Sequence, residues 1–128
     1  MGYIRHHGML ITTYKEELTA QVRAKAVEIF GDLVSEARES TINGYWSFAV
    51  FAVFPDGSSE GWPDSDKGDR NRATFKTWLN TLRYEDGSTS VDWVEVQYGD
   101  DDHETCIIAD SDHPEEATIV DAVIMLPD

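Results

Sequence analysis

Residues 45–54 form the strongest hydrophobic pattern in the chain, and turn-forming residues bound them on both sides. Asn43-Gly44 precedes the segment and Pro55-Asp56-Gly57 follows it. In a strand, alternate side chains share a face. One face would then carry Trp46, Phe48, Val50, Ala52 and Phe54, and the other Tyr45, Ser47, Ala49, Phe51 and Val53. We expect an inner strand with its even-numbered face in the core, and we expect something to cover the fairly apolar odd-numbered face.

Two segments have the spacing of amphipathic helices. The first, residues 14–30, would begin at a capping box of Thr13 and Glu16 and stop at Gly31. The second, residues 69–83, would be capped by Asp66 or Asp69. Its apolar stripe at i, i+3, i+4 and i+7 consists of Phe75, Trp78, Leu79 and Leu82.

Four more segments read as strands: residues 9–13, a polar edge strand at 33–40, residues 91–98, and their hairpin partner at 105–109. The resulting order is strand, helix, strand, strand, helix, strand, strand. This order predicts a ferredoxin-like α+β fold with one added strand, in which two amphipathic helices cover one face of an antiparallel sheet.

A chain of 128 residues fits a single domain, here residues 1–128. Residues 110–128 form a C-terminal extension, and the apolar run within it could be an edge strand, a helix begun at Pro114, or a dimer contact. Together with the odd-numbered face of strand 45–54, the run 119–126 offers more apolar surface than two helices can easily cover. The sequence therefore predicts a homodimer.

Charge narrows the choice of partners. The chain carries 25 acidic and 10 basic residues, a net charge of −15. Free nucleic acid is thus a poor partner, whereas a basic protein surface is a suitable one. Solubility alone explains the same charge more readily than a charge-matched partner does. With one cysteine, Cys106, no intrachain disulfide can form, and no membrane-spanning run or leader is visible, so we expect a cytoplasmic protein.

Two charged clusters are candidate binding sites. An acidic turn contains Asp100, Asp101, Asp102 and Glu104. It could meet a basic partner; a solvated hairpin tip explains it better than a cation site. We predict neither a metal nor a cofactor, and no catalytic residue, because no nucleophile elbow or phosphate loop is present.

The second cluster gathers half of all the basic residues: Lys67, Arg70, Arg72, Lys76 and Arg83. One reading is an anion site, in which Arg70, Arg72 and Lys76 hold a phosphate group and Trp62 stacks on a base. The other is pairing within the molecule, with acids of the turn at Asp100 or of the C-terminal extension.

Three segments suggest a family. The chain opens with Met-Gly-Tyr-Ile-Arg-His-His, continues through the loop from Glu60-Gly61-Trp62 to Gly68-Asp69, and has Asp-Trp-Val-Glu-Val-Gln-Tyr-Gly-Asp-Asp-Asp at residues 92–102. Over roughly residues 1–105 it resembles small uncharacterised accessory proteins of tailed bacteriophages. The resemblance implies a host cytoplasmic setting, and it carries no activity or site residue.

Three functions follow as hypotheses. The leading one is a non-enzymatic phage protein that inhibits or redirects a host protein or defence system through its acidic surface. The alternatives are a sponge that sequesters a nucleotide second messenger of host immunity, and a small enzyme of unrecognised type.

Overall fold

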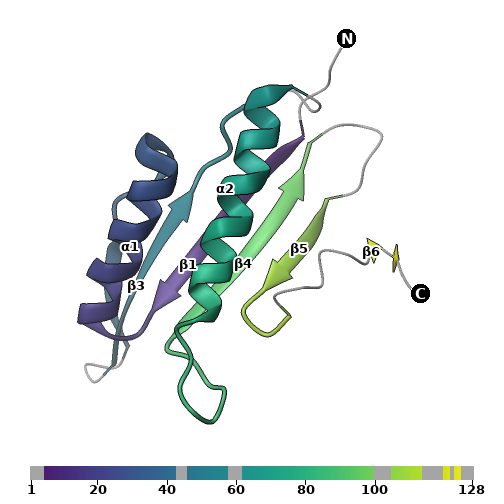
Figure 1. Cartoon of the computed structure of the whole chain (residues 1–128). Helices are drawn as coiled ribbons and strands as arrows, with labels where there is room; N and C mark the ends of the chain where they lie inside the picture. The colour runs from purple at the N-terminus through teal and green to yellow at the C-terminus, as the bar shows by residue number, and fades with distance from the viewer. Residues whose placement is uncertain are drawn as a thin grey trace.

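The computed structural model describes residues 5–42, 46–57, 62–99, 105–113, 120–121 and 123–124. Five strands and two helices follow one another along the chain in the predicted order (Figure 1). Their bounds are β1 (His6–Thr13), α1 (Glu16–Phe30), β2 (Arg38–Ile42), β3 (Trp46–Val53), α2 (Pro63–Asn80), β4 (Val91–Tyr98) and β5 (Cys106–Asp110). A short 3₁₀ turn, η1 (Gly31–Leu33), follows α1. The α+β prediction is confirmed.

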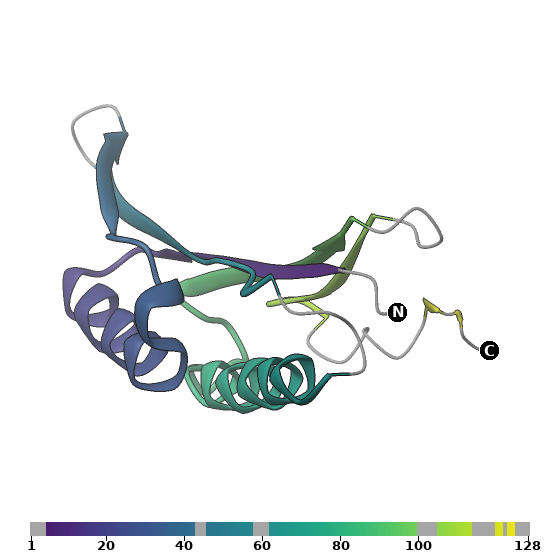
Figure 2. The same ribbon diagram turned by 90° about the horizontal axis from the view of Figure 1, so that it is seen from above.

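The five strands form one sheet in the order β2-β3-β1-β4-β5, and every neighbouring pair is antiparallel. Strand β3 is an inner strand, as predicted, while β1 lies at the centre. Each helix connects two strands that have a third between them, and both helices pack on the same side of the sheet (Figure 2). The opposite side carries no described helix.

The expected core face of β3 was wrong. Its odd-numbered residues Ala49, Phe51 and Val53 are at most 3% exposed, whereas the even-numbered residues from Phe48 to Ala52 are only half-buried. The register explains this, because Phe51 and Val53 lie opposite Ile11 and Met9, the core residues of β1. Residues directly opposite each other share a face. The helices therefore cover the odd-numbered face.

Both helix starts differ from the prediction. The residue preceding α1 is Lys15, which makes no capping bond through its side chain. Thr13 instead ends β1, and its hydroxyl bonds with that of Thr19. The end of α1 at Gly31, at φ 62°, is as predicted. Gly31 donates its N–H to the carbonyl of Val27, and glycine adopts this positive φ without strain because it has no Cβ.

Helix α2 begins six residues earlier than expected. Pro63 occupies its first turn, where a missing N–H costs nothing. Asp64 and Asp66 also lie in that turn, where negatively charged carboxylates interact favourably with the helix dipole. The N-cap is Trp62, so the expected cap at Asp66 or Asp69 was wrong.

The apolar stripe of α2 fills the core as predicted. Phe75 is fully buried and Leu79 nearly so. The ring of Phe75 meets Phe30 of α1 edge-on at 5.6 Å and stacks on Trp78 at 6.1 Å. The contact between Phe75 and Phe30 joins the two helices over the sheet.

The two edges of the sheet are short strands. The edge strand β2 lies further along the chain than the predicted range 33–40. It pairs with β3 as a hairpin, and the turn at Asn43-Gly44 falls outside the described residues. Within the C-terminal extension, β6 (Val120–Asp121) and β7 (Val123–Ile124) pair with each other and not with the five-stranded sheet.

Candidate functional site

Two of the predicted anion-binding residues lie in an ion cluster between α2 and β4. Arg72 and Lys76 both contact the carboxylate of Glu95, with 3.2 Å between Arg72 Nε and Glu95 Oε2. Arg72 also pairs with Asp69 one turn earlier on α2. Only 5% of the Glu95 side chain and 11% of the Arg72 side chain are exposed. The cluster is therefore a structural part of the helix–sheet interface.

The periodicity of both elements creates this cluster. Arg72 and Lys76 are four residues apart, so they lie on the same helix face. Glu95 is on the core face of β4 with Val91 and Trp93, where an unpaired carboxylate would be costly. Sequence reasoning missed Glu95, although its odd number, shared with Trp93, was an available signal. Arg72 and Lys76 pair within the molecule, with Glu95 and Asp69, and the acids of the turn at Asp100 lie outside the described residues.

The other two predicted ligand residues lie elsewhere on α2. Arg70 is exposed, and it is two residues from Arg72, a spacing that turns side chains to different helix faces. Trp62 is 61% exposed at the helix start. Of the four predicted residues, the structure brings together Arg72 and Lys76, around an acid rather than around an open anion site.

A cleft of about 470 Å³ lies where the end of α1 faces the start of α2. Its apolar lining consists of Ile29, Phe30, Leu33, Val53 and Phe54, and its charged lining includes Asp56, Asp64, Lys67 and Arg72. A Cβ on Gly68 would lie 3.1 Å from the Arg72 guanidinium and 3.4 Å from Asp56. Glycine therefore permits Arg72 to lie against the helix. The mixture of charges gives the cleft no dominant sign.

The predicted partner-binding acids Asp100, Asp101, Asp102 and Glu104 lie outside the described residues. The strands on either side are described: β4 ends at Tyr98 and β5 begins at Cys106. Because these strands are an antiparallel pair, the acids belong to their connection.

Acidic and basic side chains are segregated by burial. Of the 16 acidic residues whose burial is described, 14 are exposed, whereas only four of the 10 basic residues are. We call the exposed carboxylates the acidic surface: Glu16, Glu17, Glu28, Asp32, Glu36, Glu39, Asp56, Asp64, Asp66, Asp69, Glu85, Asp86, Asp92 and Asp112. The exposed basic residues are Lys15, Arg38, Lys67 and Arg70. The surface is thus more acidic than the composition alone requires.

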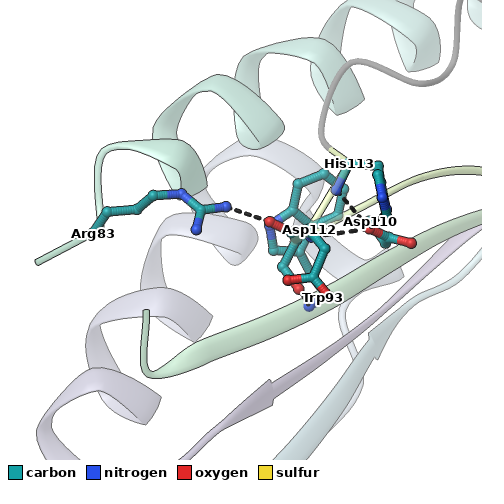
Figure 3. A network of polar contacts seen from close by, with 6 residues as sticks. Arg83, Trp93, Asp110, Asp112 and His113 are labelled. Carbon is teal, nitrogen blue, oxygen red and sulfur yellow. Dashed lines mark hydrogen bonds and ion pairs between the residues drawn. The ribbon is translucent and has the colours of Figure 1, made fainter. Parts of the chain in front are cut away.

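Arg83 is an example of a basic side chain that is hydrogen-bonded within the molecule. Its guanidinium donates to the Gly87 carbonyl at 2.9 Å and to the carbonyl of Ser111, which joins the loop after α2 to the segment after β5 (Figure 3). That segment is also held by Asp110, whose carboxylate accepts the backbone N–H of Asp112 at 2.9 Å and that of His113 at 2.7 Å. Arg83 is therefore occupied by backbone carbonyls, well away from the start of α2.

In the described part of the chain, no group of three or more His, Cys, Asp or Glu side chains is arranged to hold a metal ion. None of the helices in that part is both long and apolar enough to span a membrane.

No protein-family model matches the chain, and neither a curated protein nor a solved structure matches it.

Proposed function

We propose that this protein is a non-enzymatic binding protein that holds a basic surface of another protein through its acidic surface. The segregation of charge by burial carries the proposal. Fourteen exposed carboxylates face solvent, while Arg72 and Lys76 turn inward to Glu95. Such a surface attracts basic partners at long range and repels nucleic acid.

The resemblance to phage accessory proteins supplies a context for the partner. We propose that the protein acts in a bacterial host cytoplasm, where it inhibits or redirects a host protein or a defence system. An inhibitor that only occupies the surface of its partner needs no catalytic group. This mode of action suits a molecule whose buried charged residues hold a helix against the sheet.

The first experiment identifies the partner and tests the acidic turn. The tagged protein is used to recover partners from host lysate, and affinity for the purified partner is then measured at 50 and 300 mM NaCl. Because exposed charges are screened within about 10 Å at 0.1 M salt, we expect weaker binding at high salt. Changing Asp100, Asp101 and Asp102 together to Asn should weaken binding and flatten its salt dependence.

A matched control removes the same charge at the other end of the sheet. The variant Glu16→Gln, Glu17→Gln, Glu85→Gln changes three exposed acids near the start of α1 and in the loop before β4, away from the end of β4 and the start of β5 (Figure 1). Because we propose that the acidic turn at residues 100–102 makes the direct contact and that the rest of the acidic surface adds only long-range attraction, this variant should bind almost normally. Equal losses in both triple variants would mean that only net charge matters, and no loss in either would reject the acidic surface as the binding site.

The cleft beside α2 supports a second candidate, a nucleotide sponge. Lys67 and Arg72 line its wall, and Arg70 and Trp62 are exposed nearby on the same helix. Mass spectrometry of small molecules released by heating the pure protein tests this candidate directly. A co-purified nucleotide would favour the sponge, and turnover of an added nucleotide would instead favour the third hypothesis, an enzyme.

A further inference from the structure

One whole face of the five-stranded sheet is left uncovered by the described chain. Both helices pack on the face that carries Ile11, Phe51 and Trp93 (Figure 2). The side chains of the opposite face, the open face, are identified by the register, because cross-strand neighbours share a side. Leu10 of the central strand lies between Ala52 and Val94 in this face.

The open face is apolar across its middle. Leu10 is 53% exposed, and Ile107, which lies opposite Val96, is 62% exposed. Half-buried apolar residues join them: Phe48, Val50, Ala52, Val94 and Val96. Solvated sheet faces are usually polar, so a contiguous apolar face on so charged a chain indicates an interface.

Charged residues on the open face are restricted to its perimeter. Arg38 lies on the β2 edge, opposite Val50, and Asp110 lies on the β5 edge, opposite Val94. Asp92 is near the start of β4, where it accepts a hydrogen bond from the Tyr14 hydroxyl at 2.9 Å. That bond raises the pKa of Tyr14 above its usual value, with smaller contributions from burial and from the charge of Asp92.

We propose that a second copy of this chain covers the open face, with the two sheets packed face to face. The area is sufficient. Five strands spaced about 4.8 Å apart and up to eight residues long give a face of roughly 24 by 26 Å, or about 600 Å². Two such faces bury about 1,200 Å² in total, which reaches the range of stable specific interfaces.

The positions of the edge charges favour a second copy over another apolar partner. Strand β1 is the middle strand, so a twofold axis along it places β2 of one copy over β5 of the other. Arg38 pairs across the sheet in the row of Thr12, and Asp110 pairs in the adjacent row of Leu10. The axis therefore brings Arg38 close to Asp110 of the second copy, twice per dimer. The open face is complementary to itself in charge as well as in apolar character.

The first test is the molar mass of the full chain, measured by light scattering and sedimentation from 1 to 500 µM. We expect a dimer, and we expect salt to strengthen it. Each copy carries a net charge of −15, so raising NaCl from 50 to 500 mM screens the mutual repulsion. Association with a basic partner would respond to salt in the opposite direction. A monomer at 500 µM in high salt would overturn the proposal.

The second test places a charge at the centre of the interface. Leu10→Glu introduces two carboxylates that face each other near the axis, and it also removes two buried leucines. We expect dimerisation to weaken by about 100-fold or more. The matched control is Val27→Glu on the outer side of α1, where the wild-type side chain is 40% exposed. This variant should dimerise normally. Circular dichroism checks that both variants fold.

A third variant protects the test against misfolding of Leu10→Glu. Ile107 lies on an edge strand and is the most exposed apolar residue of the open face among those whose burial is described, so Ile107→Glu should also weaken the dimer. A wild-type dimer unaffected by both open-face variants would mean that another surface mediates association. Failure here leaves the acidic-surface proposal standing, because the asparagine variants at residues 100–102 are read out on partner binding and not on mass.

Discussion

The carboxylate of Glu95 determines the role of two basic residues. Arg72 and Lys76 converge on it beneath the sheet, and Asp69 completes the set on the solvent side of Arg72. A buried ion cluster contributes little net stability compared with apolar packing, but removal of one member leaves charges that are desolvated and unpaired. Its role is then to fix how α2 sits on β4.

This arrangement gives a prediction at the residue scale. Changing Glu95 to Gln should lower the free energy of unfolding by about 3–5 kcal/mol, toward the lower value because Asp69 still faces Arg72. Urea denaturation measures the loss. Asp69→Asn is the control, since 56% of that side chain is exposed and a pair so open to water is worth about 1 kcal/mol at most.

A triple change separates loss of the pair from loss of packing. If Glu95→Leu is combined with Arg72→Met and Lys76→Met, most of the stability should return, because apolar residues of similar volume can replace a buried ion cluster. A Glu95→Gln variant as stable as wild type would show that the cluster contributes nothing measurable to folding.

Single positions also show what a pattern can and cannot reveal. The alternation in β3 was correct, but both of its faces are apolar, so the sequence did not indicate which one the helices cover. Strand β1 determines which face of β3 is covered, because its core residues Met9 and Ile11 are opposite Val53 and Phe51. The alternation of side chains in β4 would have placed Glu95 in the core with Trp93. A buried carboxylate would in turn have predicted basic partners.

At the scale of elements, an aromatic contact between Phe75 and Phe30 joins the two helices. Phe75 is fully buried between α2 and the sheet, edge-on to Phe30 and stacked on Trp78. We predict that Phe75→Ala lowers the free energy of unfolding by about 3–5 kcal/mol, because the cavity removes contacts on every side.

The control is Trp62, the aromatic residue at the N-cap of the same helix. Trp62→Ala removes a larger ring that is 61% exposed, so its effect on thermal unfolding should be much smaller. Equal shifts in Tm for the two variants would contradict the assignment of Phe75 to the core.

Most elements could be predicted because their periodicity is local. Strand β4 matches its predicted range, residues 91–98, and the stripe of α2 is buried as expected. The start of α2 was missed because Pro63, Asp64 and Ser65 read equally well as a loop. Pro63 in a first helical turn was the overlooked signal. The residue preceding each helix makes no side-chain cap, so cap rules could not locate either start.

At the scale of the whole molecule, the composition gives the net charge but not its distribution. The sequence predicted −15 and a cluster of basic residues near α2. Only the fold shows that 14 of the 16 acids whose burial is described are exposed, while six of the 10 basic residues are at least half-buried. The distribution of charge depends on which face of each strand the helices cover, and residues far apart in the sequence determine that.

This distribution leads to the last prediction, which concerns the stability of the folded chain. The exposed carboxylates repel one another in the compact state, and this repulsion is strongest at low salt. Raising NaCl from 10 to 300 mM shortens the screening length below about 10 Å. We expect Tm to rise by several degrees, equivalent to about 1 kcal/mol. The measurement is made at about 1 µM, to limit the contribution of dimerisation.

The variant Glu36→Gln, Glu39→Gln, Glu85→Gln removes three charges that are all exposed. It should be more stable than wild type at 10 mM NaCl and respond less to salt. Because Glu36 pairs weakly with Arg23 at 3.4 Å, a version that keeps Glu36 serves as the control. A Tm that falls with added salt would mean that favourable ion pairs outweigh repulsion, and the acidic surface would then be balanced within the molecule rather than available to a partner.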